Sequence, residues 1–338
     1  MQERLYKIRE HAKYGFINEQ AEVVIEPQYY EVEDFYQGFS RVRFNDRLVP
    51  MDTLGRLLMK HFFNYVGLFE EGLARVQLVS KWGYINERGT IVVPIAYYEA
   101  EDFSEGKAAV RRSARFGYLN KAGDWAIAPQ YERAWTFSEQ LAAAQSNGYC
   151  GYIDAAGDWV IEPRFERCLA FQSGVAIVVV EDQWGLIDRH GTLLLPPQFE
   201  FSNDEVPSFF EERASFQQNG KYGFINSNGE IVASPTYAFV GDFSNGLALV
   251  QEKARFGYIN LEGHLAIKTQ FEDAQVFAEG LAAVQYQRKW GYINTTGEWI
   301  IRPKYEQAMP FKNGLALVAQ NGKWQYLNQQ GLVIWQEK

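Results

Sequence analysis

A phrase of six residues recurs along the chain at an almost constant spacing, and this periodicity restricts the fold more than any other feature. Residues 81–86 read Lys-Trp-Gly-Tyr-Ile-Asn, and close copies occupy 13–18, 115–120 and 289–294. With the glycine of the phrase as an anchor, the chain contains ten anchors; eight of the nine intervals are 34 residues and one is 38. Such a period indicates a tandem array of one small structural unit. The anchors are Gly15, Val49, Gly83, Gly117, Gly151, Gly185, Gly223, Gly257, Gly291 and Gln325.

Other positions, numbered here from the anchor, repeat in the same phase. Position +3 is Asn or Asp in all ten units, and position +6 is Gly in nine of them. Position +14 is aromatic in every unit that reaches it, and in most units a Phe follows six residues later. Each unit closes with a Gly-Leu-Ala-x-Val phrase, as in 72–76. The extra residues of the long interval therefore lie near 204–208, in the sixth unit.

Three short strands fit each unit. They are the Leu-Ala-x-Val stretch (73–78), the Trp-Gly-Tyr-Ile stretch (81–85) and the stretch after the turn glycine (158–165 in the fifth unit). Asn or Asp followed three residues later by Gly is typical of a hairpin, because the Asx side chain bonds nearby backbone and Gly accepts a positive φ. The sequence therefore predicts an antiparallel, three-stranded meander in each unit.

The apolar pattern predicts how the units pack. In the second strand, Trp82 and Tyr84 share one face while Gly83 and Ile85 share the other, so both faces need cover. A unit of 34 residues cannot supply that cover alone, so neighbouring units are expected to stack on it. The anchor glycine then indicates close approach by a neighbour's backbone, and a repeated alanine indicates a narrow packing site. The alanines are Ala74, Ala108, Ala142, Ala176, Ala214, Ala248, Ala282 and Ala316.

The phrases at 81–86 and 105–110, the 34-residue spacing and the Ile-Glu-Pro-Arg-Phe-Glu block at 161–166 resemble the WG-repeat (KWG-type) family of bacterial β-repeat proteins. The resemblance covers essentially the whole chain. It implies a β-rich repeat array with a role in interaction, and it carries over no catalytic residue. A length of 338 residues would otherwise suggest two or three ordinary domains. We expect instead a single array over 1–338.

The phase of the two ends bears on the path of the array. Residues 5–8 fill the first-strand position before Gly15, and the chain stops at the third strand of the tenth unit, 333–335. Neither end of the chain then completes a sheet at the other end, as happens in many closed propellers. Ten units would also exceed the four to eight blades that propellers commonly have. We expect a curved or superhelical array of about ten meanders. A closed β-propeller-like ring, or two five-unit propellers, is the alternative.

No residue pattern in the sequence is typical of an enzyme. No Cys/His spacing indicates a metal site, and no phosphate-binding loop is present. Cys150 replaces the Trp of the anchor phrase and Cys168 replaces an Ala, so we expect buried thiols, although two cysteines of one unit could approach each other. We expect neither catalysis nor a cofactor. The four histidines occupy unrelated repeat positions: His11, His61, His190 and His264.

A glutamate follows the +14 aromatic residue in five units. Equivalent carboxylates could bind a basic partner or cations, but a solvated rim or a local cap is the commoner role, and a calcium site needs six to eight oxygens together. The five residues are Glu132, Glu166, Glu200, Glu272 and Glu306.

Departures from the repeat mark candidate functional residues. Position +18 carries Glu, Gly or Gln in most units, but it carries Trp135, Leu169 and Met309 in the fourth, fifth and ninth. Apolar residues at a usually polar position of adjacent units predict a patch that binds a partner. A local change in loop packing is the alternative explanation.

Composition narrows the class of partner. Acidic residues outnumber basic ones by 42 to 33, which argues against nucleic-acid binding and against a polybasic membrane-surface protein. The sequence contains no apolar run of 18 residues, which a membrane-spanning helix would need. The first ten residues also lack the apolar region of a signal peptide, so we expect a cytoplasmic location.

Our hypothesis is a non-catalytic interaction scaffold that binds a protein or peptide. A β-repeat protein that binds glycans or small ligands is the alternative, because concave β arrays rich in Tyr and Trp can stack sugars.

Overall fold

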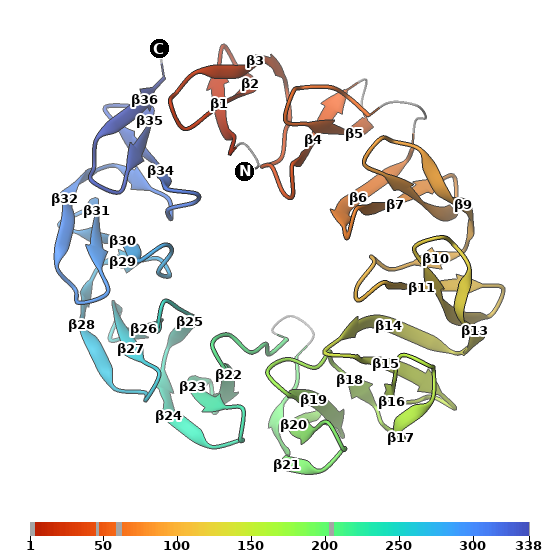
Figure 1. Cartoon of the computed structure of the whole chain (residues 1–338). Helices are drawn as coiled ribbons and strands as arrows, with labels where there is room; N and C mark the ends of the chain where they lie inside the picture. Colours follow the sequence, from red (N-terminus) through yellow and green to blue (C-terminus); the bar gives the residue numbers. More distant parts are fainter. Residues whose placement is uncertain (1–3, 45–46, 59–62, 203–205, 338) are drawn as a thin grey trace. The chain divides into compact units, whose positions relative to one another are not determined.

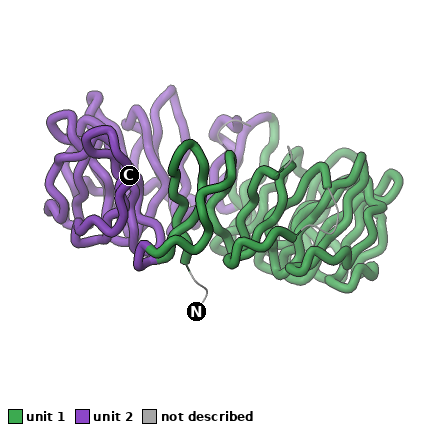
Figure 2. The backbone as a smooth tube through the Cα atoms, turned by 90° about the horizontal axis from the view of Figure 1, so that it is seen from above, with its two compact units in different colours: residues 1–18, 22–181, 186–193 green, residues 19–21, 182–185, 194–338 purple. Residues whose placement is uncertain are grey.

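The computed structural model describes residues 4–44, 47–58, 63–202 and 206–337. Over these residues the chain is all-β, with 36 strands and no helix (Figure 1). The strands follow one another as antiparallel meanders, which confirms the predicted fold class. The chain divides into two compact units, coloured separately in Figure 2. Unit 1 comprises 1–18, 22–181 and 186–193; unit 2 comprises 19–21, 182–185 and 194–338. The single array over 1–338 stays a prediction.

Unit 1 contains one sheet for each of its successive repeats. The sheet orders are β1-β2-β3, β4-β5, β6-β7-β8-β9, β10-β11-β12-β13 and β14-β15-β16-β17, and β18 pairs with β19. The strands are β1 (Tyr6–Glu10), β2 (Lys13–Ile17), β3 (Val23–Tyr29), β4 (Phe39–Phe44), β5 (Arg47–Asp52), β6 (Tyr65–Glu70), β7 (Leu73–Leu78), β8 (Lys81–Asn86), β9 (Ile91–Tyr97), β10 (Glu99–Ala100), β11 (Lys107–Arg112), β12 (Arg115–Asn120), β13 (Trp125–Tyr131), β14 (Arg133–Ser138), β15 (Leu141–Ser146), β16 (Tyr149–Ile153), β17 (Trp159–Phe165), β18 (Arg167–Cys168) and β19 (Val175–Val180).

The division between the units falls within β20 (Gln183–Asp188) and β21 (Leu193–Glu200). Unit 2 then continues with sheets of order β22-β23-β24, β25-β26-β27-β28, β29-β30-β31-β32 and β33-β34-β35-β36. These strands are β22 (Arg213–Gln218), β23 (Lys221–Asn226), β24 (Ile231–Tyr237), β25 (Phe239–Ser244), β26 (Leu247–Glu252), β27 (Arg255–Asn260), β28 (Leu265–Phe271), β29 (Asp273–Ala274), β30 (Leu281–Tyr286), β31 (Lys289–Asn294), β32 (Trp299–Tyr305), β33 (Gln307–Ala308), β34 (Leu315–Gln320), β35 (Lys323–Asn328) and β36 (Val333–Gln336).

The three predicted strands are present, and most sheets have a fourth. The expected stretch 73–78 is β7, 81–85 lies in β8, and 158–165 contains β17. The additional strand has two residues in some sheets, as in β10, where Glu99 and Ala100 pair with Arg111 and Val110, and six in others, as in β14. It is the segment that follows the third strand of one repeat and joins the sheet of the next. Of the expected insertion, 204–205 lie outside the described residues, and 206–208 form no strand.

The Asx–Gly hairpins form as the sequence predicts. In the third unit, Asn86 Oδ1 accepts the amide hydrogens of Arg88 and Thr90, each at 3.0 Å. Gly89 then adopts a φ of +68°, which only glycine takes up without strain. The side chain therefore holds the turn between the second and third strands.

The anchor glycine is approached by backbone, but not by the backbone of a neighbouring unit as we expected. A Cβ built on Gly117 would lie 2.6 Å from the carbonyl oxygen of Ile127, in the third strand of the same sheet. The cause is a double register shift, since two steps along β12 from Phe116 to Tyr118 span four steps along β13. The bulged third strand thus folds over the glycine of its own sheet.

Successive repeats stack within each unit, as the apolar faces predict. The repeated alanines are at most 1% exposed. An acidic or amide side chain at one turn also accepts an amide hydrogen from the turn 35 residues later, as Glu139 Oε2 does from Gly174 at 2.9 Å. We call these contacts the turn clamps. The others are Glu71–Gly106, Glu105–Gln140, Glu211–Gly246, Asn245–Gly280 and Glu279–Gly314.

Candidate binding surface

Position +18 combines a fixed backbone with a variable side chain. The buried tyrosine at position +1 donates its hydroxyl hydrogen to the +18 carbonyl, as Tyr118 does to Trp135 at 2.8 Å and Tyr152 to Leu169 at 2.7 Å. Burial raises the pKa of both tyrosine hydroxyls, so they remain protonated donors. Equivalent bonds join Tyr84 to Glu101, Tyr258 to Gln275 and Tyr292 to Met309. Because the carbonyl carries the structural role, the side chain at +18 can change without loss of the fold.

Two of the three predicted patch residues belong to successive repeats of unit 1. Trp135 lies in β14, and Leu169 directly follows β18; both are half-buried. Trp135 packs against the core cluster that contains Cys150, so part of its ring is structural, as the alternative explanation requires. Met309 is 41% exposed but belongs to unit 2. The structure therefore places Trp135 and Leu169 in equivalent positions of one unit and assigns Met309 to the other.

Position +18 of one repeat lies close to position +19 of the next. A Cβ built on Gly67, at +18 of the second repeat, would lie 3.4 Å from Asp102 Oδ1, at +19 of the third. In unit 2, the same construction on Gly241 meets Val276 at 3.0 Å, so the contact is a property of the repeat. We define the +18 row as the residues at this position in the repeats of unit 1. They are Glu33, Gly67, Glu101, Trp135 and Leu169.

Two arginines beside this row escaped the sequence analysis. Arg41 and Arg75 occupy the position eight residues before the anchor, where most repeats carry Ala, Ile, Leu or Ser. Arg41 pairs with Glu33 and donates to the Val66 carbonyl at 2.8 Å. Comparison of this position across the repeats would have revealed the departure, just as it did at +18.

Arg75 holds two carboxylates at once. Its Nε lies 3.0 Å from Asp102 Oδ1 and its Nη1 lies 3.5 Å from Glu101 Oε2, while the guanidinium stacks on the Trp82 ring at 5.6 Å. Burial raises the pKa of both Glu101 and Asp102, and Arg75 opposes that effect only in part. Arg133 also opposes the effect at Glu101, and Arg41 does so at Asp102, so the two carboxylates lie among several arginines in a partly desolvated setting.

Three of the five repeated glutamates act as local caps. Glu132 Oε2 accepts the amide hydrogen of Gly148 at 2.9 Å, and Glu272 Oε2 accepts that of Arg288 at 2.7 Å. Glu306 caps the turn at Gly322 in the same way. Each of the three carboxylates holds a turn of the following sheet, such as the turn between β15 and β16, in agreement with the local role weighed above.

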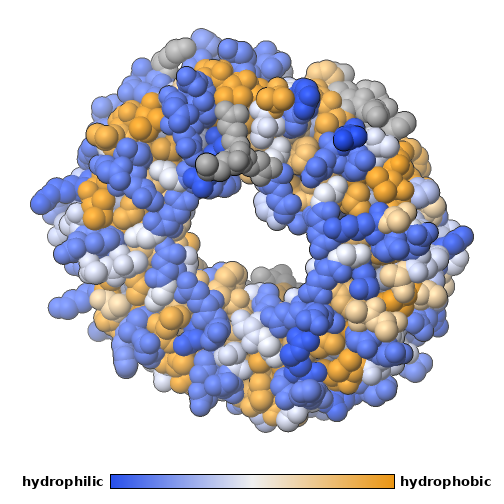
Figure 3. All heavy atoms as spheres, in the orientation of Figure 1, coloured by the Kyte–Doolittle hydropathy of each residue, from blue (hydrophilic) through white to orange (hydrophobic). Residues whose placement is uncertain are grey.

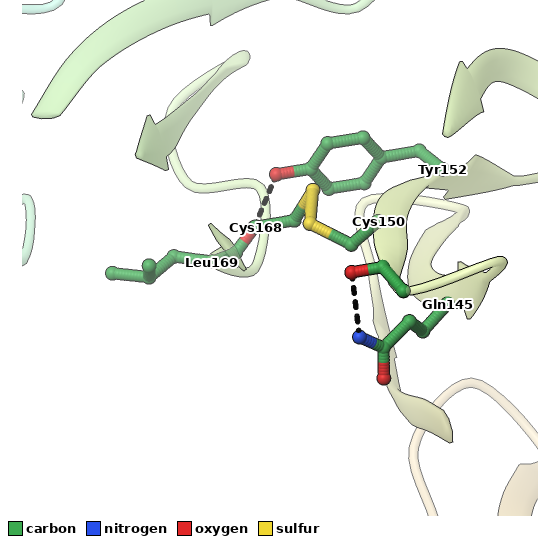
Figure 4. The surroundings of a disulfide bond; sticks show 6 residues. Gln145, Cys150, Tyr152, Cys168 and Leu169 are labelled. Atoms are coloured by element: carbon green, nitrogen blue, oxygen red, sulfur yellow. Dashed lines mark hydrogen bonds between the residues drawn. A yellow bond between two sulfur atoms is a disulfide. The ribbon is translucent and has the colours of Figure 1, made fainter. Parts of the chain in front are cut away.

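The expectation of free thiols is wrong. Cys150, in β16, and Cys168, in β18, form a disulfide with a Cα–Cα distance of 6.0 Å (Figure 4). Both residues are buried, as expected, at 1% and 9% exposure. The pairing arises because the segment after β17 returns into the core cluster that contains Cys150. The sequence shows the shared repeat but not this return, so it left the pairing open.

His190 and His264 lie exposed in hairpin turns, and His61 lies outside the described residues. In the described part of the chain, no three His, Cys, Asp or Glu side chains gather as a metal site would require.

The described residues include no helix with the length and apolar character needed to cross a membrane. On the face drawn in Figure 3, hydrophobic residues are scattered among hydrophilic ones.

The stacked meanders and their row of variable side chains define a tandem β-repeat protein. The family model described as WG containing repeat matches nine segments of the sequence. The chain therefore belongs to the WG-repeat family. The matched segments are 14–47, 51–81, 82–113, 116–150, 151–184, 184–222, 222–254, 256–290 and 290–324.

Several solved structures are similar to this chain, although all share little sequence with it. The crystal structure of a eukaryotic initiation factor has a TM-score of 0.56 at 10% identity, and the match covers 100% of this chain and 96% of that one. Kluyveromyces lactis Hsv2p gives 0.39 at 9% identity, over 68% and 93% of the two chains. Dihydro-heme d1 dehydrogenase NirN in complex with DHE gives 0.41 at 10% identity, over 100% and 73%. No curated protein matches the sequence. The likeness to the initiation factor shows the fold alone.

Proposed function

We propose that this protein is a non-catalytic scaffold that binds an extended peptide segment of a protein partner through the +18 row of unit 1. One observation carries the proposal: the tyrosine hydroxyl holds the +18 carbonyl, as between Tyr118 and Trp135, and leaves the side chain outside that structural bond. The side chains then change from acidic to apolar along successive repeats. A repeat array commonly binds through such an extended surface.

The chemistry of the row favours a segment that carries basic side chains next to apolar ones. Burial raises the pKa of Glu101 and Asp102 even with Arg75 beside them, so a further cation from a partner would relieve the cost of their burial. Trp135 and Leu169 offer the adjacent apolar contacts, and tryptophan is enriched among residues that dominate binding energy. The net charge of −9 also attracts basic segments over longer distances.

Selection from a library of random peptides tests the proposal. Peptides selected on the oxidised protein are measured by fluorescence polarisation against the native chain and single variants. Trp135→Ala and Leu169→Ala should each weaken binding on the order of tenfold, since loss of a dominant interface residue costs about 1–2 kcal/mol or more. Glu101→Gln should weaken basic peptides and leave neutral ones unaffected.

Met309→Ala is the matched control, because Met309 occupies the same repeat position in unit 2 and is 41% exposed. It should leave the affinity unchanged. If the Trp135 and Leu169 variants retain native affinity for every selected peptide, the +18 row is not the binding site. A glycan array serves as the competing test, since glycan binding without peptide binding would favour the alternative function.

A further inference from the structure

Leu169 is held by two separate links to β16. Cys168 immediately precedes it and is bonded to Cys150 of β16. Tyr152, two residues further along β16, donates its hydroxyl hydrogen to the Leu169 carbonyl at 2.7 Å. Figure 4 shows the two links side by side, with the Leu169 side chain directed away from them. The position of this member of the +18 row therefore depends on a covalent bond as well as on a hydrogen bond.

Other repeats achieve the same placement without a disulfide. Where the fifth repeat has Cys150 and Cys168, the ninth has Trp290 and Ala308, and both of these are buried in one core cluster. The third and fourth repeats likewise combine an aromatic residue with an alanine. A large ring fills the space beneath the loop in those repeats. Two cysteine side chains together are smaller than an aromatic residue with an alanine. In the fifth repeat we therefore infer that the disulfide, and not a bulky side chain, holds the loop in place.

We propose that the Cys150–Cys168 disulfide makes the +18 row redox-dependent. The inference rests on the proposed function, because it concerns regulation of the same surface. In the oxidised chain the bond ties the segment that carries Leu169 to β16, and reduction releases that segment. Disulfides persist in oxidising compartments and are reduced in the cytosol. The protein would thus bind its partner in the first setting and release it in the second.

The reaction is an exchange with a dithiol reductant. A thiolate of the dithiol attacks one sulfur of the pair and forms a mixed disulfide, and the second thiol then displaces the remaining cysteine. The chain gains two electrons and two protons, which leave it with two thiols, and the reductant becomes a cyclic disulfide. Intact mass therefore reports the extent of reduction as a gain of two hydrogens.

Hydrogen exchange tests the structural coupling without any partner. The Leu169 amide bonds the Ile177 carbonyl at 2.9 Å, so it is protected while the segment is in place. Full reduction with dithiothreitol should accelerate exchange across 166–172 by an order of magnitude or more. The equivalent segment of the eighth repeat, 272–278, is the internal control. It has no cysteine, it belongs to unit 2, and its Gln275 amide bonds the Ala283 carbonyl at 2.9 Å. Unchanged exchange across 166–172 after full reduction would overturn the inference.

Two variants connect the coupling to binding. The double variant Cys150→Trp with Cys168→Ala reproduces the pair found in the ninth repeat, and it should bind the selected peptides equally well with and without dithiothreitol. Reduction of the native chain should weaken them on the order of tenfold. Cys150→Ser with Cys168→Ser should behave like the reduced chain in both assays. Faster exchange with unchanged peptide affinity would also overturn the proposal. A failed peptide selection, in contrast, would count against the proposed function and leave the exchange result standing.

Discussion

At the scale of single residues, the anchor position is glycine where the third strand of the same repeat bulges over it. In the tenth repeat Gln325 takes the anchor position, and it pairs directly with Gln336 without the register shift found beside Gly117. Where the third strand does not bulge over the anchor, a side chain fits. The glycine is therefore a consequence of the bulge, and the two features are expected to change together.

We predict that Gly117→Ala destabilises the protein by about 1–3 kcal/mol, because the new Cβ would meet the Ile127 carbonyl, which belongs to backbone and cannot rotate away. Urea denaturation measures the loss. Gly67→Ala is the control, since its Cβ would meet the Arg75 side chain at 3.0 Å, and that chain can move. Equal losses for the two substitutions would contradict the bulge argument.

The pH dependence of stability should report the burial of Asp102. Burial raises its pKa in the folded state, so the ionised carboxylate opposes folding at neutral pH. This cost is absent below the pKa of the unfolded chain and is complete above the raised folded value. We predict that Asp102→Asn stabilises the protein at about pH 7 and that the gain disappears as the pH falls through the raised pKa.

Urea denaturation over a series of pH values provides the measurement for Asp102→Asn. Arg75 keeps the Ala100 carbonyl and Glu101 as partners in this variant, so it is not left isolated. A variant that is less stable than the native chain at neutral pH would show that the pairing with Arg75 outweighs the cost of burial.

At the scale of the meander, the link between repeats is maintained even where its usual residue is lost. The first repeat has Phe16 in place of the tyrosine, so no hydroxyl reaches the Glu33 carbonyl from that position. Ser40, which replaces the usual alanine, donates to this carbonyl instead at 2.7 Å. Two departures from the repeat thus compensate each other, and one buried acceptor remains satisfied.

We predict that Ser40→Ala destabilises the protein by about 1–3 kcal/mol, although alanine is the usual residue there, because the Glu33 carbonyl loses its donor. Adding Phe16→Tyr should recover most of the loss by restoring the bond that the other repeats use. A double-mutant cycle from urea denaturation gives the coupling between the two positions. Additive effects would argue against a shared acceptor.

The sequence was sufficient to predict the three strands of each repeat, but not the additional strand or the disulfide that connect one repeat to the next. Strand limits near Leu73, Lys81 and Trp159 followed from strict repetition and the Asx–Gly turns. The two-residue strand Glu99–Ala100 did not, because two residues carry no periodic signal. Likewise, Trp135 and Leu169 stood out as departures within one position, whereas the disulfide joins two different positions. Its pairing depends on how the chain returns between repeats, which spacing does not encode.

At the scale of the whole molecule, stability should be distributed locally. Each repeat in a unit is held by contacts with the next, such as the turn clamps and the tyrosine bonds, and such arrays lose structure near the site of damage first. The division into two units makes this expectation specific, because repeats of the same unit should lose protection together after a destabilising substitution.

We predict that Tyr258→Phe, which removes the bond to the Gln275 carbonyl, accelerates amide exchange in β27 and β29 of unit 2. Exchange in β8 and β12 of unit 1 should not change. Hydrogen exchange with mass spectrometry measures both at once. A uniform increase over the described strands would show instead that the chain opens as one cooperative body.

The turn clamps carry a consequence for how such a chain can change in length. Several copies of the repeat supply both the acceptor that binds the following copy and the amide that binds the preceding copy, as Glu139 and Gln140 do at one turn. A gene duplication that adds one whole copy therefore brings a complete joint with it. We therefore expect that insertion or deletion of one whole copy leaves the remaining clamps in place.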